Sequence, residues 1–272
     1  MTDAVNDTIP DLAADASAYD EETRQALVDY LLTLGDDGLI LSHRLSEWCG
    51  HGPVLEEDIA LTNIALDLIG QARLLLSHAG QLEGKGRDED ALAYRRDVAD
   101  FRNHLLVEEP NGDFAMTIAR QFLFSSWAYE LFSWLGRSAD PGLAAIAAKS
   151  LKEVTYHRRH AGEWMIRLGD GTEESKRRVQ AALEDLWIFT DELFQGEPGD
   201  AFLIDAGIIP DPADLRAGWD AMVERVLEEA TLTRPQPDFK RSGGREGHHS
   251  EHLGYILAEM QFLPRAYPDA RW

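Results

Sequence analysis

Glu153 and His157 are the residues of this chain whose types and spacing are best suited to chemistry. They lie four positions apart in the stretch KEVTYHRRHAGEWM, and four steps along a helix return to nearly the same direction, so both side chains would share one face. A carboxylate and an imidazole in this relation can share a metal ion, or they can form a hydrogen-bonded pair in a crowded core. His160 and Glu163 follow within three turns of the same helix. The stretch therefore predicts either half of a metal site or a buried polar network.

A di-iron site of the kind found in helical bundles requires more ligands than this stretch offers. Such a site takes a carboxylate from each of two helices and a Glu-x-x-His pair from each of two others. The residue three positions before His157 is Val154, which has no donor atom. The one strict Glu-x-x-His of the sequence, Glu246 to His249, lies in a glycine-rich stretch where helical geometry is not expected.

The other long apolar segments do not supply the missing ligands. Residues 58–77 contain no histidine, and their nearest candidates are Asp67 and Gln71. Glutamine is a neutral, weak ligand for iron. The aromatic segment over residues 114–137 contributes only Glu130. The ligand count therefore predicts no metal site and no catalytic residue in this chain.

The pattern of apolar residues predicts the elements that position these side chains. Apolar residues recur at three- and four-residue intervals and β-branched alternation is nearly absent, which predicts an all-α fold. Many long helices without a clear linker predict one helical bundle domain over residues 21–272, after an acidic disordered tail over residues 1–20. Glycines at positions 35 and 38 could bend the first helix. The expected helices cover residues 20–49, 55–80, 90–108, 113–137, 143–168, 173–194, 212–232 and 250–265.

Composition excludes several classes of function. The 272 residues include 49 acidic and 26 basic side chains, a formal net charge of −23 that would repel nucleic-acid phosphates and anionic membrane surfaces. The single cysteine, Cys49, cannot form an intrachain disulfide and suits a reducing compartment. The N-terminal stretch lacks the basic and apolar regions of a secretory signal, and the most apolar stretch, FLFSSWAYELFSWL, is too short to span a membrane. We therefore expect a cytoplasmic protein with no nucleic-acid or membrane partner.

Four stretches carry a resemblance to a known family: LGDDGLILSHRLSEWCGHGPVLEEDIALTNIALDLIGQARLLL, VEEPNGDFAMTIARQF, AAKSLKEVTYHRRHAGEWMIRLGDGTEES and EHLGYILAEMQFLPR. They are similar to the structural C subunits of bacterial phenylacetyl-CoA epoxidase, the multicomponent ring-1,2-monooxygenase of aerobic phenylacetate catabolism. The similarity runs from about Tyr30 to Trp272. It implies a ferritin-like bundle that does not itself catalyse the reaction. The expected partners are a catalytic A subunit that carries the di-iron centre and binds the CoA thioester, a small B subunit, and a reductase that delivers electrons from NADPH.

Alignment with the catalytic relative sharpens the ligand search. Its first Glu-x-x-His falls on Leu68 and Gln71 of this chain, and its second falls on Val154 and His157. Three of these four positions have lost their donor, and a leucine and a valine would fill the vacated volume. The resemblance thus implies no cofactor in this chain, with Glu153 and His160 retained as part of a polar cluster. The alternatives are an autonomous di-iron oxygenase and an acyl-CoA-binding module.

A small basic island occurs near the C-terminus, in the stretch KRSGGREGHHSEH. It contains Lys240, Arg241 and Arg245 around two glycines, just before a predicted helix. Backbone amides at a glycine-rich turn that leads into a helix can hold an anion. One interpretation is contact with CoA phosphates or with an acidic patch of a partner, and the other is a flexible solvated loop. The island's histidines could trap a divalent ion, but no carboxylate-rich shell accompanies them: His248, His249 and His252.

Overall fold

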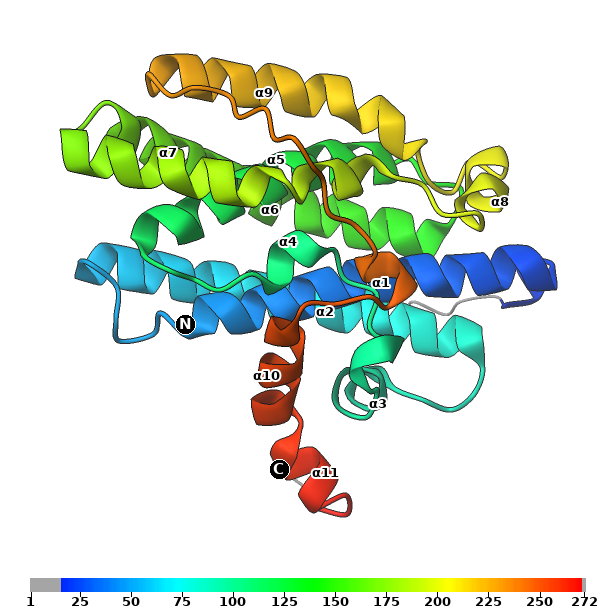
Figure 1. The fold of residues 1–272 in the computed structure, drawn as a ribbon. Coiled ribbons are helices and arrows are strands. Elements are labelled where there is room, and N and C mark those ends of the chain that lie inside the picture. Colours follow the sequence, from blue (N-terminus) through cyan, green and yellow to red (C-terminus); the bar gives the residue numbers. More distant parts are fainter. Residues whose placement is uncertain (1–15, 271–272) are drawn as a thin grey trace, which may run out of the picture.

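The computed structural model describes residues 16–270, and every regular element in that range is a helix (Figure 1). The prediction of an all-α fold is therefore confirmed. Four long helices form the central bundle, in which the second and third are joined by one long crossover, as in ferritin-like folds. These helices are α1 (Glu21–Ser46), α2 (Leu55–Glu83), α5 (Phe114–Leu135) and α6 (Pro141–Gly169).

Side-chain caps fix where the core helices begin. The Asp20 carboxylate accepts a hydrogen bond from the Thr23 amide at the start of α1. Asp113 caps α5 in the same way, and Asp140 caps α6, which has a proline at its first position. Aspartate at this position satisfies amides that have no partner within the helix and also favours the positive end of the helix dipole. These local signals explain why the expected starts of α5 and α6 lie within two residues of the observed ones.

The first two helices pack along each other because α1 carries two glycines on the face toward α2. A Cβ atom at Gly35 would lie 2.7 Å from Leu76 Cδ2, and one at Gly38 would lie 3.0 Å from the Leu68 carbonyl oxygen. The glycines therefore permit close approach, and α1 continues through them as one helix. Helix α6 lies beside both α5 and α2 and so closes the bundle.

The crossover between α2 and α5 departs from the sequence prediction. A helix over residues 90–108 is wrong, because the segment forms three short pieces: α3 (Glu89–Tyr94), η2 (Val98–Asp100) and α4 (Leu105–Glu108). Two buried carboxylates of α1 take the backbone amides that a continuous helix would use internally. The Arg102 amide donates to Asp36 Oδ2 at 2.9 Å, and the His104 amide donates to Asp37 Oδ1 at 2.8 Å.

An outer layer covers the α5 and α6 side of the bundle (Figure 1). Its largest anchor is Trp219, which is fully buried and donates its indole N–H to the Leu123 carbonyl at 3.0 Å. The aromatic helix α5 is consequently covered on several sides and belongs to the core. The predicted helices over residues 173–194 and 212–232 each begin or end in a 3₁₀ turn. The layer consists of α7 (Glu173–Trp187), η3 (Thr190–Phe194), α8 (Asp200–Asp205), η4 (Pro212–Leu215) and α9 (Arg216–Glu229).

The chain ends in an arm that projects from the bundle beside α3 (Figure 1). After a 3₁₀ turn, η5 (Gly244–Glu246), the arm consists of α10 (Glu251–Met260) and α11 (Phe262–Ala266). We call residues 251–270 the C-terminal arm.

Two further expectations concern the tail and the membrane. Residues 1–15 of the tail expected over residues 1–20 lie outside the described residues, whereas Tyr19 donates its hydroxyl to Asp140 Oδ2 at 2.7 Å. Within the described range, α2 alone is long and apolar enough to pass a test for a membrane span, but half of its most apolar window is buried inside the protein. A core helix of a bundle has the same composition.

Candidate functional site

The four positions that would hold metal ligands meet where α2 faces α6. Leu68 and Gln71 come from α2, and Val154 and His157 come from α6; they are 3, 4, 1 and 2% exposed, respectively. Leu68 and Val154 therefore occupy, as hydrocarbon, the interior volume that ligand carboxylates would need. We call this contact between the two helices the α2–α6 seam.

The polar side chains of the seam pair with one another across it. Each pair joins α2 to α6, and the pairs lie at successive levels along the two helices. The three hydrogen bonds are Gln71 Nε2 to Glu153 Oε2 at 2.8 Å, His157 Nε2 with Asp67 Oδ2 at 2.9 Å, and His160 Nε2 with Glu57 Oε2 at 2.8 Å.

The electrostatics of the seam differ from those of a metal centre. Burial raises the pKa of Glu153, the Gln71 hydrogen bond opposes that rise, and the charge of Asp67 adds to it. A carboxylate beside a cation would instead have a lowered pKa. Each acid of the seam is matched by one amide or one imidazole, so the carboxylates do not converge on a common point.

The remaining expected contributors point elsewhere. Glu130, the acid of the aromatic helix, lies 3.6 Å from Arg158 Nη1 and against Gly218 of α9. Glu163 is exposed and lies 4.0 Å from Arg167 Nη2. Over residues 16–270, no group of three or more His, Cys, Asp or Glu side chains is arranged to hold a metal ion. The residues of this chain therefore do not fit a di-iron centre.

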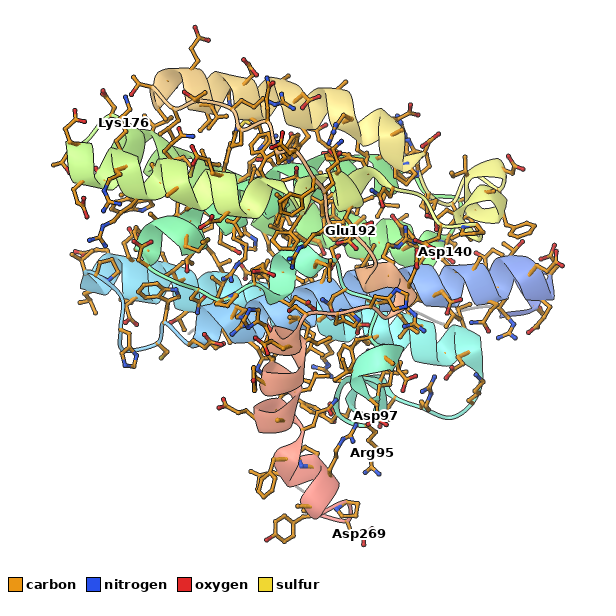
Figure 2. The ribbon with its side chains drawn as sticks, viewed as in Figure 1. Arg95, Asp97, Asp140, Lys176, Glu192 and Asp269 are labelled. Atoms are coloured by element: carbon orange, nitrogen blue, oxygen red, sulfur yellow. The ribbon has the colours of Figure 1, made fainter. Side chains whose placement is uncertain are left out.

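The glycine-rich loop does hold an anion, and that anion belongs to the protein itself. The amides of Gly243 and Gly244 each donate to Glu192 Oε1 at 2.8 Å, and the Leu105 amide donates to Glu192 Oε2 at 2.7 Å. Glu192, labelled in Figure 2, is only 2% exposed. The carboxylate thus joins η3, α4 and the loop that precedes the C-terminal arm.

The three basic residues of this loop have different surroundings. Arg245 is largely buried and donates to both carboxylate oxygens of Asp200, at 2.9 and 3.0 Å. Lys240 pairs with Asp191. Arg241 is exposed and has no salt bridge among the described residues. Of the three cations, Arg241 is therefore the one whose charge is not already matched within the chain.

A second buried cluster was not predicted from the sequence. His104 Nδ1 contacts Asp37 Oδ2 at 2.8 Å, and His249 Nδ1 contacts Glu108 Oε2 at 3.0 Å. The other ring nitrogen of His249 faces the Phe101 carbonyl at 3.0 Å, so a doubly protonated ring would satisfy both acceptors. Paired acids in the middle of an apolar helix, as in LGDDGLIL, are the sequence signal that could have revealed this cluster.

Charge pairing sets the protonation of these two histidines. Burial acts to lower the pKa of His104, but the charge and hydrogen bond of Asp37 outweigh burial and raise it overall. Burial likewise acts to lower the pKa of His249, and the hydrogen bonds to Glu108 and the Phe101 carbonyl raise it overall. The cluster therefore fastens the base of the C-terminal arm to α1 and α4 by charged hydrogen bonds.

The comparisons with known proteins agree with this arrangement. Residues 3–272 match the sequence model of the family described as phenylacetic acid catabolic protein. The chain is 53% identical over 246 residues to the C subunit of 1,2-phenylacetyl-CoA epoxidase from Escherichia coli (strain K12), a match that covers 90% of this chain and 99% of that relative. The resemblance found in the sequence motifs is thereby confirmed, and the chain belongs to the phenylacetic acid catabolic protein family.

Proposed function

We propose that this chain is a non-catalytic subunit of a multicomponent phenylacetyl-CoA epoxidase and that it supports a ferritin-like catalytic subunit that holds the di-iron centre. The observation that carries the proposal is the filling of the α2–α6 seam. Leu68 and Val154 occupy the interior where ligands would stand, and hydrogen bonds within the chain consume the nearby acids. Oxygen activation would therefore take place in the partner, with electrons supplied from NADPH through a reductase.

Helix α2 offers a surface on which such a partner would pack. Four large apolar side chains point outward along it: Leu55, Ile59, Leu66 and Ile69, which are 72, 52, 61 and 40% exposed. Their spacing of four, seven and three residues places them in one stripe on the helix. Tyr156 of α6 is also exposed. Exposed apolar residues gathered along one helix are typical of a subunit interface rather than a solvated surface.

The net charge is compatible with protein partners and unsuited to nucleic acids. At −23, the chain repels phosphate backbones. The small B subunit and the reductase complete the proposed complex, by analogy with the multicomponent epoxidase that the E. coli relative's name describes.

A reconstitution tests this function. The chain is co-expressed with the catalytic subunit, and complex formation, iron content and epoxidation of phenylacetyl-CoA are measured. We expect a stoichiometric complex whose iron and activity follow the catalytic subunit. Changing Leu55, Ile59 and Leu66 to Glu should abolish the complex while leaving the isolated chain folded.

A matched control changes three apolar residues that are exposed elsewhere, Val98, Phe202 and Phe239, to Glu. This control should still assemble. Epoxidation by the isolated chain would overturn the proposal, and binding of phenylacetyl-CoA by the isolated chain would instead favour an acyl-CoA-binding module.

A further inference from the structure

The C-terminal arm and α3 enclose a groove of about 810 Å³ on the opposite side of the crossover from the outer layer. Asp90, Tyr94 and Arg95 line it from α3 and the residue that follows, and Glu259, Leu263 and Tyr267 line it from the arm. A smaller hollow of about 430 Å³ between α2 and α3 shares Asp90 and Tyr94 with the groove. The two hollows therefore form one continuous depression.

Hydrogen bonds hold the groove open as a preformed feature. Gln261, which is 4% exposed, donates to the carbonyls of Ala93 and Arg96 at 3.1 and 3.0 Å. Arg265 donates to the Arg96 carbonyl at 2.7 Å and to Asp97 Oδ1 at 2.9 Å. Figure 2 shows Arg95 and Asp97 on the side of the body that faces the arm. Because the arm is already fixed, a ligand would not have to order it.

The groove has exposed apolar side chains on the arm. Leu263 and Tyr267 are 48 and 61% exposed, and Tyr255 and Phe262 on the same arm are 66 and 65% exposed. Four large exposed apolar residues within thirteen positions are unusual for a solvated surface. The arm is therefore suited to contact another protein.

The walls of the groove are acidic and incompletely neutralised. Neither Asp90 nor Glu259 has a salt bridge in the part of the chain that the structure describes, and Asp88 adds a third acid. Arg95, the cation of the lining, donates to the Pro268 carbonyl at 3.3 Å. Burial raises the pKa of Asp90, and the neighbouring charges of Glu89 and Asp88 raise it further. A cation placed between these acids would relieve their repulsion.

We infer that this groove receives a short cationic amphipathic helix from another subunit of the complex. Its apolar face would pack on Leu263 and Tyr267, and its lysine or arginine side chains would pair with Asp90 and Glu259. A second copy of this chain is disfavoured as the occupant because each copy carries a net charge of −23. A helix lying in an apolar groove is a common mode of recognition. The inference rests on the proposed function only in taking the occupant from the epoxidase complex.

Site-specific photocrosslinking in the assembled complex tests the inference. A benzophenone amino acid replaces Leu263 in the full-length chain, which is co-expressed with the other epoxidase subunits, and crosslinked peptides are identified by mass spectrometry. We expect one crosslinked partner segment that carries lysine or arginine together with apolar residues at helical spacing.

Charge reversal supplies the matched control. The double variant Asp90→Lys/Glu259→Lys should reduce the crosslink yield about tenfold, because two attractions become repulsions. The double variant Asp205→Lys/Glu229→Lys changes net charge equally at exposed sites outside the groove and should leave the yield unchanged. All these positions are exposed, so the thermal melts of the variants should match that of the parent chain.

Other results would overturn the inference. These results are a crosslink only to a second copy of this chain, a crosslink only to an acidic or uncharged segment, an equal yield in both double variants, and no crosslink. If the complex assembles and epoxidises its substrate without the crosslink, the groove inference fails and the proposed function stands. If the parent chain enters no complex, both fail.

Discussion

Replacing Glu192 with Gln should destabilise the protein by about 3–5 kcal/mol. The carboxylate accepts hydrogen bonds from three backbone amides, two from the loop glycines and one from Leu105. A glutamine oxygen could keep the two glycine amides, but its NH₂ group would then face the Leu105 amide, donor against donor. Loss of a charge-assisted hydrogen bond costs about 1.5–3 kcal/mol, and a buried unsatisfied donor costs about 1–3 kcal/mol more.

Two measurements check this expectation. Urea denaturation should show the loss in the free energy of unfolding, and the thermal midpoint should fall by about 6–15 °C, at roughly 2–4 °C per kcal/mol for a chain of this size. Hydrogen exchange should accelerate most over residues 243–266, because Glu192 anchors the loop that leads into the C-terminal arm. The control Glu184→Gln makes the same change on the exposed face of α7 and should cost less than about 0.5 kcal/mol. Equal stability of the two variants would refute the reasoning.

Three further predictions follow from the burial and pairing of single side chains. Leu68→Ala should cost about 2–5 kcal/mol in urea denaturation because Leu68 fills the seam, whereas Leu66→Ala should leave the isolated chain stable and weaken assembly with the catalytic subunit; similar costs for both would contradict this. Arg245→Ala should cost about 3–5 kcal/mol because it leaves a buried aspartate unpaired, whereas Arg241→Ala should be nearly neutral in stability, and a change in acyl-CoA affinity in the Arg241 variant would revive the role predicted for the loop. The raised pKa of His249 in the folded protein means that its contribution to stability is complete below its unfolded pKa of about 6.5 and is lost as pH rises through the folded value. Unfolding measured from pH 6 to pH 9 should show this loss in the parent chain and a smaller loss in His249→Gln; identical pH profiles would contradict the assignment.

Local signals in the sequence were sufficient to predict the long helices. Caps such as Asp113 and Asp140, together with a proline at the first position of α6, mark helix starts through contacts within three residues. The crossover could not be predicted in this way. Its helical periodicity is overridden by Asp36 and Asp37, whose carboxylates lie more than 60 positions earlier in the chain and bind its backbone amides.

The candidate site divides along the same line. The loss of donors at Leu68, Gln71 and Val154 can be read from residue types, because hydrocarbon cannot bind a metal. The partners of the retained histidines depend on how α2 and α6 align, and sequence reasoning did not identify Asp67 and Glu57 in that role.

The glycine-rich loop gives a similar lesson. The amides of Gly243 and Gly244 were expected to be able to hold an anion, as their chemistry allows. That Glu192, some 50 residues away, supplies the anion depends on the tertiary packing.

Iron stoichiometry of the purified chain tests the central claim most directly. The chain is loaded anaerobically with Fe(II), freed of excess metal by gel filtration and analysed for bound iron, alongside the His157→Gln variant. The proposed role predicts substoichiometric iron in both proteins, because the imidazole of His157 bonds Asp67 rather than a metal. Two tightly bound irons per chain, lost in the variant, would contradict it.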